Sequence, residues 1–344
     1  MLLNADFSSL CTLSLGGVIT HLPWKNLSEL TTFELWRVPG DKISVTQLLD
    51  FFVNAPFLDN IELHSIPNLS DAPPGRVVSI PHLENLTIST DLAHSILLDH
   101  LSIPTRANLF LNFKFSGEKF PPPDFLPKAA KNLENLSHVT TVNLYFHEGQ
   151  KYMRLDGPSG GISICGNWED WVEAASLDLD RRILRSLDYF ALSRTERLAI
   201  TGYEPLTLTE IDKSSPYHIL DGMKNLRTLV LTRCNNLPFI LALDPNQSPS
   251  KPVLCPMLKE LNLYVDERDS FNITELRSMV KERALKDAQL SSIVIVGLGE
   301  LVPGREVFKL RKYVPHVEYR VEDIAPEWYS IPGDEYACSF VSLP

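Results

Sequence analysis

The spacing of apolar residues between Leu226 and Leu237 constrains the fold more than any other feature of this sequence. The stretch reads LRTLVLTRCNNL. Leu229 and Leu231 are two residues apart, so both side chains point to the same face of a short strand. Leu226 and Leu237 fold over that face from the flanking turns, and Cys234 fits a small buried position at the corner. The stretch predicts a strand whose apolar face needs neighbours to cover it.

The same spacing recurs along almost the whole chain. The further copies are Leu10/Leu13/Leu15, Leu30/Phe33/Leu35, Leu58/Ile61/Leu63, Leu83/Leu86/Ile88, Val139/Val142/Leu144, Thr195/Leu198/Ile200, Leu258/Leu261/Leu263 and Leu290/Ile293/Ile295. This is the spacing of leucine-rich repeats, whose units stack because none can bury its apolar face alone. We therefore expect an α/β fold, an irregular leucine-rich-repeat solenoid with a parallel sheet on one face and helices and loops on the other.

The extent of the repeats predicts one elongated unit over residues 1–324, followed by an irregular tail over residues 325–344. Two features interrupt the regular spacing. KYMRL, DGPSGG and ISIC predict a hairpin inserted at about residues 151–166, beside the regular sheet. Apolar residues three and four positions apart then predict a long helix at about residues 170–190, packed on the back of the sheet.

Two shorter helices are expected from capping boxes. In a capping box, a polar side chain accepts a hydrogen bond from the first helical turn, and a Gln or Glu three residues later reaches back. Ser44 with Gln47 and Asn272 with Glu275 have this spacing. We expect a helix to begin at each pair.

Charge and cysteine usage exclude several classes of function. The 344 residues carry a formal net charge of -11 and no run of Lys or Arg, which argues against nucleic acid as a partner. The five cysteines are scattered without a C-x-x-C pair, so we expect neither a disulfide framework nor a zinc site.

Targeting signals are not evident in the sequence. The N-terminal MLLNADFSSL has no basic region of the kind that opens a secretion signal. No apolar run approaches the roughly 18 residues that a membrane-spanning helix needs. A cytoplasmic or nuclear protein that does not associate with membranes is the expectation.

The strongest catalytic motif is a G-x-S-x-G match at Gly157–Gly161. In hydrolases this nucleophile elbow follows a strand and opens a helix, which places the serine beside an oxyanion hole. Here residues typical of strands flank both sides, and glycine, proline and serine suit a hairpin turn. We expect a turn rather than a catalytic serine.

Histidines offer no metal site by their spacing. His94 and His100, with Asp99, form the nearest approach to a ligand set. Six residues on a helix place two side chains about 240° apart, too far round to share one ion. His147 beside Glu148 lacks the second histidine of H-E-x-x-H. No catalytic, cofactor-binding or metal-ligating residue is therefore predicted, and the chain is not expected to be an enzyme.

The predicted functional surface is the outward face of the repeat strands. Residues that alternate with the core leucines point away from the core, and a rigid row of polar side chains suits recognition of a protein surface. The alternative is a sheet face that is polar only because it meets water. The candidate partner-binding residues are Thr12, Ser14, Thr32, Glu34, Asn60, Glu62, Asn85, Thr87, Thr141, Asn143, Arg197, Thr228, Glu260 and Asn262.

Four stretches carry a more specific resemblance. They are LTTFELWRVPGDKISVTQLLDFFVNAPFLDNIELHS from Leu30, RCNNLPFILAL from Arg233, KPVLCPMLKELNLYV from Lys251 and SSIVIVGLGELVPGREVFKLRKYVPHVEYRV from Ser291. They resemble the leucine-rich-repeat C-terminal region of F-box proteins from mushroom-forming (basidiomycete) fungi. The resemblance implies the substrate-recognition part of an SCF-type E3 ubiquitin ligase, with a protein substrate as partner.

The F-box itself has no counterpart in this sequence, because the first repeat begins almost at once. In the family, this N-terminal module docks on the Skp adaptor, so no residue here inherits adaptor binding. Two interpretations stay open: a part of a longer F-box protein, or a stand-alone leucine-rich-repeat binding or scaffold protein with no link to a ubiquitin ligase. SCF components are expected as partners only if a longer product supplies the F-box.

Overall fold

The computed structural model describes thirteen ranges of the chain and groups their residues into two compact units. Unit 1 lies within Met1–Val139 and Tyr152–Ser176, and unit 2 within Thr140–Lys151 and Leu177–Pro344. The described residues are 8–17, 27–36, 44–65, 73–90, 97–114, 132–147, 150–167, 187, 190–202, 215–247, 252–265, 271–298 and 304–322. The tail predicted at residues 325–344, and the helix predicted at residues 170–190 apart from Leu187 and Phe190, lie outside them.

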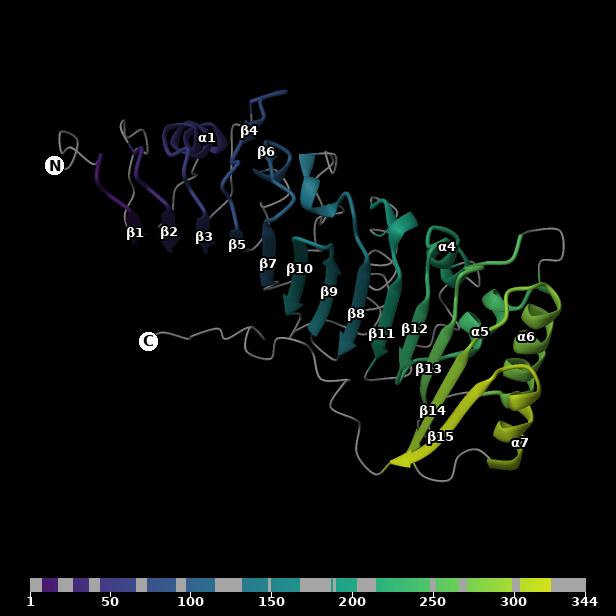
Figure 1. The fold of residues 1–344 in the computed structure, drawn as a ribbon. Helices are drawn as coiled ribbons and strands as arrows, with labels where there is room; N and C mark the ends of the chain where they lie inside the picture. The colour runs from purple at the N-terminus through teal and green to yellow at the C-terminus, as the bar shows by residue number, and fades with distance from the viewer. Residues whose placement is uncertain are drawn as a thin grey trace. The chain divides into compact units, whose positions relative to one another are not determined.

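Unit 1 is built on a mostly parallel sheet whose strands lie side by side in Figure 1. The parallel pairs are β1 with β2, β2 with β3, β3 with β5, β5 with β7, and β7 with β10. The order is β1 (Thr12–Gly16), β2 (Thr32–Trp36), β3 (Asn60–His64), β5 (Asn85–Thr90), β7 (Asn108–Lys114), β10 (Gly161–Asn167) and β9 (Gln150–Asp156).

Unit 2 repeats the arrangement with a fully parallel set of strands. Their order is β8 (Thr141–His147), β11 (Arg197–Gly202), β12 (Thr228–Thr232), β13 (Glu260–Val265), β14 (Ser292–Leu298) and β15 (His316–Glu322). The prediction of an α/β protein with a large, mostly parallel sheet is therefore confirmed.

The leucine triplets explain where the strands form. Every triplet identified in the sequence contributes its last two apolar residues to a strand. In unit 2, Leu229 pairs with Leu261 and Leu261 with Ile293, and all three are fully buried. Burial of one such side chain contributes roughly 1.5–3 kcal/mol, so the aligned rows form a core along one face of the sheet.

Backbone hydrogen bonds fix the register where each strand begins. The Thr31 and Thr32 N–H groups both donate to the Cys11 carbonyl, at 2.9 and 3.0 Å. The Asp59 and Asn60 N–H groups donate in the same way to the Thr31 carbonyl, at 2.9 and 3.1 Å. A shift of one residue would turn the leucines to the other face, so this repeated contact protects the core.

Short helices and turns connect the strands. In Figure 1, α5, α6 and α7 lie on one side of the unit 2 strands. Unit 1 contains α1 (Val45–Asn54), η2 (Glu134–Leu136) and a small parallel pair of β4 (Val78–Ser79) and β6 (Leu101–Ser102). Unit 2 contains η4 (Leu192–Arg194), α4 (Ser215–Asp221), α5 (Leu237–Leu243), α6 (Ile273–Leu285), α7 (Gly304–Phe308) and η5 (Lys309–Lys312).

The two predicted capping boxes have different outcomes. The Asn272 side chain accepts hydrogen bonds from the Thr274 and Glu275 N–H groups at 3.0 and 3.3 Å, so the predicted start of α6 is confirmed. Ser44 is the N-cap of α1, but its side chain makes no capping hydrogen bond, and that part of the prediction is wrong. Five apolar side chains of α1 are buried, and this packing holds the helix without the cap: Val45, Leu48, Leu49, Phe51 and Phe52.

The hairpin of β9 and β10 closes through backbone that approaches very tightly. The Gly157 N–H donates to the Gly160 carbonyl at 2.8 Å across the turn. The buried Asn135 side chain donates to the Ala107 and Gly161 carbonyls at 3.1 and 2.9 Å, tying the hairpin to the start of β7. A Cβ atom at Gly160 would lie 2.4 Å from the Ala107 carbonyl oxygen, so only glycine fits there.

The Gly160→Ala substitution tests this close approach. Because the clashing atom is backbone, the hairpin must move, and we expect the free energy of unfolding to fall by about 2–3 kcal/mol in a urea titration. Gly16→Ala is the matched control, since a Cβ at Gly16 meets nothing within 4 Å. Equal stability of the two variants would contradict the packing described here.

A buried arginine closes the core between α6 and the loop before β13. Arg283 is fully buried and donates to the Leu254 and Cys255 carbonyls, each at 2.8 Å. Burial lowers the pKa of the Arg283 guanidinium to about 10. These bonds give the Leu254 carbonyl a donor and add to the one that the Cys255 carbonyl accepts from the Leu258 N–H, which offsets the cost of burying the charge.

Arg283→Met should therefore destabilise unit 2 although methionine fills similar space. Two hydrogen bonds are lost, and the Leu254 carbonyl loses its donor while the Cys255 carbonyl keeps the bond from the Leu258 N–H, so we expect the free energy of unfolding to fall by about 2 kcal/mol. Arg277→Met, on the same helix but part-exposed beside Glu306, should change stability little. A guanidinium chloride titration measures both, and a stable Arg283→Met protein would refute the role assigned to this side chain.

Candidate functional site

The candidate residues of unit 1 align in two rows across the sheet. Because the strands are parallel and in register, residues at the same height on neighbouring strands are only about 4.8 Å apart. The first row is Thr12, Thr32, Asn60 and Asn85, and the second is Ser14, Glu34, Glu62 and Thr87. All eight residues that the sequence singled out in this unit are thus brought together.

The candidate residues of unit 2 form one continuous row and one interrupted row. Thr141, Arg197, Thr228 and Glu260 align directly, and the Thr228 hydroxyl donates to the Glu260 carboxylate at 3.1 Å. In the second row, Ala199 and Val230 stand between Asn143 and Asn262, so the polar face is broken by small apolar side chains there.

Exposure of these residues follows the predicted alternation. Thr12, Ser14 and Glu260 are exposed, and the other candidates are half-buried between their neighbours. The residues that alternate with them, such as Phe33 and Leu261, are fully buried on the opposite face. These candidates therefore lie on the face of the strands opposite the buried leucines in each unit.

A third row, which the sequence analysis missed, adds aromatic side chains in unit 1. Trp36, His64, Ser89 and Asn112 align one step beyond the second row. The Trp36 and His64 rings stack with centroids 3.9 Å apart and an interplanar angle of 15°, and Trp36 remains 37% exposed. Continuing the strand alternation from Glu34 to Trp36 would have found this row.

The middle of the corresponding row of unit 2 is closed to solvent, whereas Tyr145 and Thr201 in the same row are half-buried and Arg320 is exposed. Thr232, Tyr264 and Val296 align on β12, β13 and β14, and all three are buried although the alternation turns them away from the leucine face. The accessible sheet face of unit 2 is consequently narrower at β12, β13 and β14 than at β11 and β15.

Two carboxylates stand side by side on the face of unit 1. Glu34 and Glu62 are partners in the register of β2 and β3. Trp36 Nε1 donates to Glu34 at 3.4 Å, Asn60 Nδ2 donates to Glu62 at 3.4 Å, and His64 Nε2 lies 3.3 Å from Glu62. Among the ion pairs of the described residues, none joins a Lys or Arg to either carboxylate.

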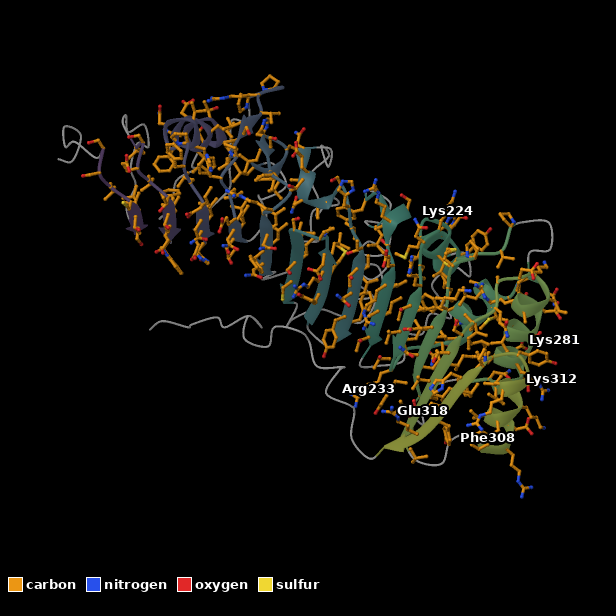
Figure 2. The ribbon with its side chains drawn as sticks, viewed as in Figure 1. Lys224, Arg233, Lys281, Phe308, Lys312 and Glu318 are labelled. Atoms are coloured by element: carbon orange, nitrogen blue, oxygen red, sulfur yellow. The ribbon has the colours of Figure 1, made fainter. Side chains whose placement is uncertain are left out.

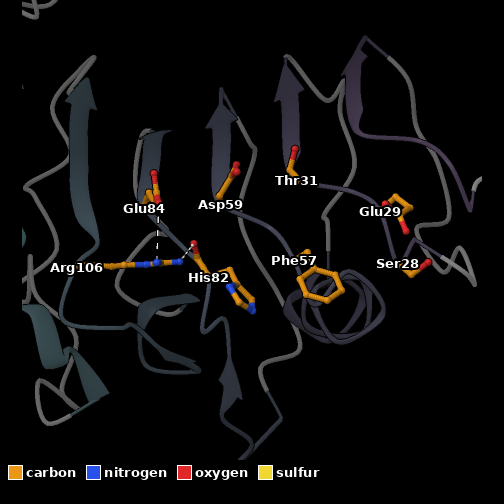
Figure 3. A pocket seen from close by; sticks show the side chains of 8 residues that line it. All are labelled: Ser28, Glu29, Thr31, Phe57, Asp59, His82, Glu84 and Arg106. Carbon is orange, nitrogen blue, oxygen red and sulfur yellow. Dashed lines mark hydrogen bonds and ion pairs between the residues drawn. The ribbon is translucent and has the colours of Figure 1, made fainter.

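A shallow groove of about 420 Å³ lies along the N-terminal ends of the strands in unit 1, which we call their leading ends. Figure 3 shows Arg106 directed toward Glu84, with an ion pair of 4.0 Å, and it also donates to the His82 carbonyl at 2.8 Å. The groove therefore carries its own cation. The lining residues are Ser28, Glu29, Thr31, Phe57, Asp59, His82, Glu84 and Arg106.

The structure shows where the G-x-S-x-G match and the histidines named in the sequence analysis lie. Gly157–Gly160 forms the turn between two strands, which differs from the strand–turn–helix context of a nucleophile elbow. His100 Nδ1 lies 2.7 Å from the Arg76 carbonyl, while His94 lies outside the described residues. No group of three or more potential metal ligands occurs within the described ranges.

The cysteines of the described ranges give no activated thiol at the buried positions. Cys234 and Cys255 are buried, whereas Cys11 is exposed and Cys165 is half-buried. Burial raises the pKa of the Cys255 thiol to about 12, so this thiol stays protonated at neutral pH. Its Sγ donates to the Leu220 carbonyl at 3.3 Å, which indicates a packing role.

Charged side chains of unit 2 are distributed over both sides of its sheet. Figure 2 shows Lys281, Lys312 and Phe308 on the side of the helices, and Arg233 and Glu318 on the opposite side. Glu318 is paired with Arg320, which holds the pKa of that carboxyl below its usual range. The acidic pair on β2 and β3 thus differs from Glu318, which has an arginine partner on its own strand.

Comparison with known proteins adds no relative. The chain matches no protein-family model and no curated protein. Within the described ranges, every helix is too short or too polar to span a bilayer.

Glu34→Gln tests the electrostatics of the carboxylate pair. Like charges opposite one another on neighbouring strands destabilise a sheet, and glutamine still accepts the hydrogen bond from Trp36. We expect the free energy of unfolding to rise by about 0.5 kcal/mol at low salt, measured by urea titration. The gain should shrink at ~1 M salt, where screening acts over about 3 Å. A lower free energy of unfolding for Glu34→Gln would contradict repulsion between the Glu34 and Glu62 carboxylates.

Proposed function

We propose that this protein is a leucine-rich-repeat solenoid that binds a partner protein through the outward face of its strands. One observation carries the proposal: polar, part-exposed side chains align in register over a fully buried apolar layer. Such rows offer hydrogen-bond donors and acceptors at fixed spacing, which suits the surface of another protein.

Rigidity of the face supports this function. The outward residues of the inner strands β2, β3 and β5 lie between two neighbouring strands, and backbone hydrogen bonds where the strands begin fix the register. A partner that docks on a rigid surface loses less conformational entropy in the complex, so more of the contact energy appears as affinity. The groove at the leading ends of the unit 1 strands is open and polar, which favours a protein partner over a small molecule.

The resemblance to fungal F-box proteins supports a more specific version of this proposal. In that version the chain selects the substrate of an SCF-type ubiquitin ligase, and a longer product supplies the F-box that contacts the Skp adaptor. The protein then acts in the cytoplasm or nucleus and is itself no enzyme. The competing version is a stand-alone binding or scaffold protein that uses the same face.

Affinity capture from the source cells tests the face with a charged substitution. Thr87→Arg places a long cation in the second row of unit 1, and we expect it to reduce the recovery of specific partners at least about tenfold. Val53→Arg is the matched control, because Val53 is 56% exposed on α1 and adds the same charge away from the sheet face. Partners are quantified by mass spectrometry.

The identity of the captured proteins separates the two versions. Skp adaptor and cullin among the proteins retained by the control support the ligase version, and their consistent absence supports the stand-alone version. Unchanged recovery with Thr87→Arg, or an equal loss with Val53→Arg, contradicts binding through this face.

A further inference from the structure

The strongest unexplained feature of the molecule is the acidic and aromatic cluster on β2 and β3. We call Glu34, Trp36, Glu62 and His64 the Trp36 cluster. Its members occupy adjacent positions of the second and third rows, and each glutamate is held by a neighbouring ring nitrogen. All four side chains are half-buried or exposed on the outward face.

Within the described ranges, no Lys or Arg forms an ion pair with either carboxylate. No Lys or Arg occurs on β1, β2, β3 or β5, the strands that surround the cluster. The only ion pair found there among the described residues is His64 with Glu62, and a histidine carries charge only when protonated. Two like charges kept adjacent on an exposed surface are unfavourable until a cation binds between them.

The exposed indole gives the cluster a second means of binding a cation. Tryptophan is the side chain that attracts cations most strongly over its ring face. The stack with His64 and the hydrogen bond from Nε1 to Glu34 hold the Trp36 ring in position beside both carboxylates. A planar cation gains most here, because it can pair with carboxylate oxygens and stack on the indole at once.

The groove at the leading ends of the strands shows the contrasting case. There the acidic residues Glu29, Asp59 and Glu84 are accompanied by Arg106, whose guanidinium lies 4.0 Å from Glu84. A cationic ligand would have to displace Arg106 from Glu84 or bind against the repulsion of its charge. Among the described residues, no Lys or Arg is paired with the Trp36 cluster in this way, so the charge complementarity of this part of unit 1 favours the cluster.

We propose that the Trp36 cluster binds an arginine side chain presented by a segment of the partner protein. The guanidinium lies between Glu34 and Glu62 and stacks on the exposed part of Trp36. This inference rests on the proposed function, since it names the partner chemistry recognised by the same sheet face. The flanking rows of Thr and Asn residues then bind the backbone and polar side chains of that segment.

Titration with short peptides tests the inference directly. The probes are a fluorescein-labelled, C-amidated peptide GRGSGRG and its glutamine analogue GQGSGQG, added to the full chain and followed by fluorescence anisotropy. We expect the arginine peptide to bind at least about tenfold more tightly than the glutamine peptide, with affinity that falls as salt rises. Equal affinity of the two peptides overturns the proposal.

Variants then locate the binding site. The Glu34→Gln/Glu62→Gln protein should bind the arginine peptide about tenfold more weakly, as should Trp36→Leu. Glu29→Gln/Glu84→Gln removes the same charge from the groove and should bind as the unchanged protein does. Loss of binding in the groove variant, with retention in the cluster variant, overturns the assignment. Urea titrations of all variants exclude unfolding as the cause of a loss.

The outcomes distinguish this inference from the proposed function. If Thr87→Arg abolishes partner capture while the cluster variants capture partners normally and the arginine peptide shows no preference, the sheet face binds protein but not through arginine. If neither the face variant nor the cluster variants affect capture, the proposed function fails as well.

Discussion

Burial of one apolar face by stacking is the interaction on which the rest of this structure depends. No single strand with its two or three leucines can cover that face, but rows such as Leu229, Leu261 and Ile293 cover one another when the strands align. Strand β1 illustrates the requirement: among the described strands it pairs with β2 alone, and its Leu13 and Leu15 are only half-buried. The alignment that buries the leucines also places the alternating polar residues in rows, so the candidate binding face is a geometric consequence of the core.

Polar side chains in the interior and on the outward face differ in whether they have partners. Inside, Arg283 and Asn135 are buried because each satisfies two backbone carbonyls at points where the chain turns. On the face, Glu34 and Glu62 stay adjacent without a basic partner on the surrounding strands. The buried contacts of Arg283 and Asn135 stabilise the fold. The adjacent carboxylates of Glu34 and Glu62 repel each other, and a cation from another molecule that binds there would remove this repulsion.

Much of this arrangement was predictable, because the period of two in a strand and the leucine spacing act locally. The triplets located their strands, and Asn272 marked the start of α6. Other features depend on tertiary contacts that no local pattern contains. The parallel pairing of β10 with β7 joins distant segments, the burial of Arg283 arises from carbonyls in another loop, and Thr232 and Tyr264 are covered although their alternation turns them outward. The Trp36 cluster is predictable from the strand period, since Trp36 lies two residues after Glu34 and so points to the same face.

Hydroxyl-radical footprinting of the chain, alone and with a captured partner, tests the central claim most directly, because indole and imidazole rings oxidise readily where water reaches them. The account predicts that Trp36 and His64 lose reactivity in the complex while Phe57 in the groove and Phe308 on the helix side of unit 2 keep theirs. Protection confined to Phe57 or Phe308, with Trp36 and His64 oxidised as in the free protein, would contradict recognition through the sheet face.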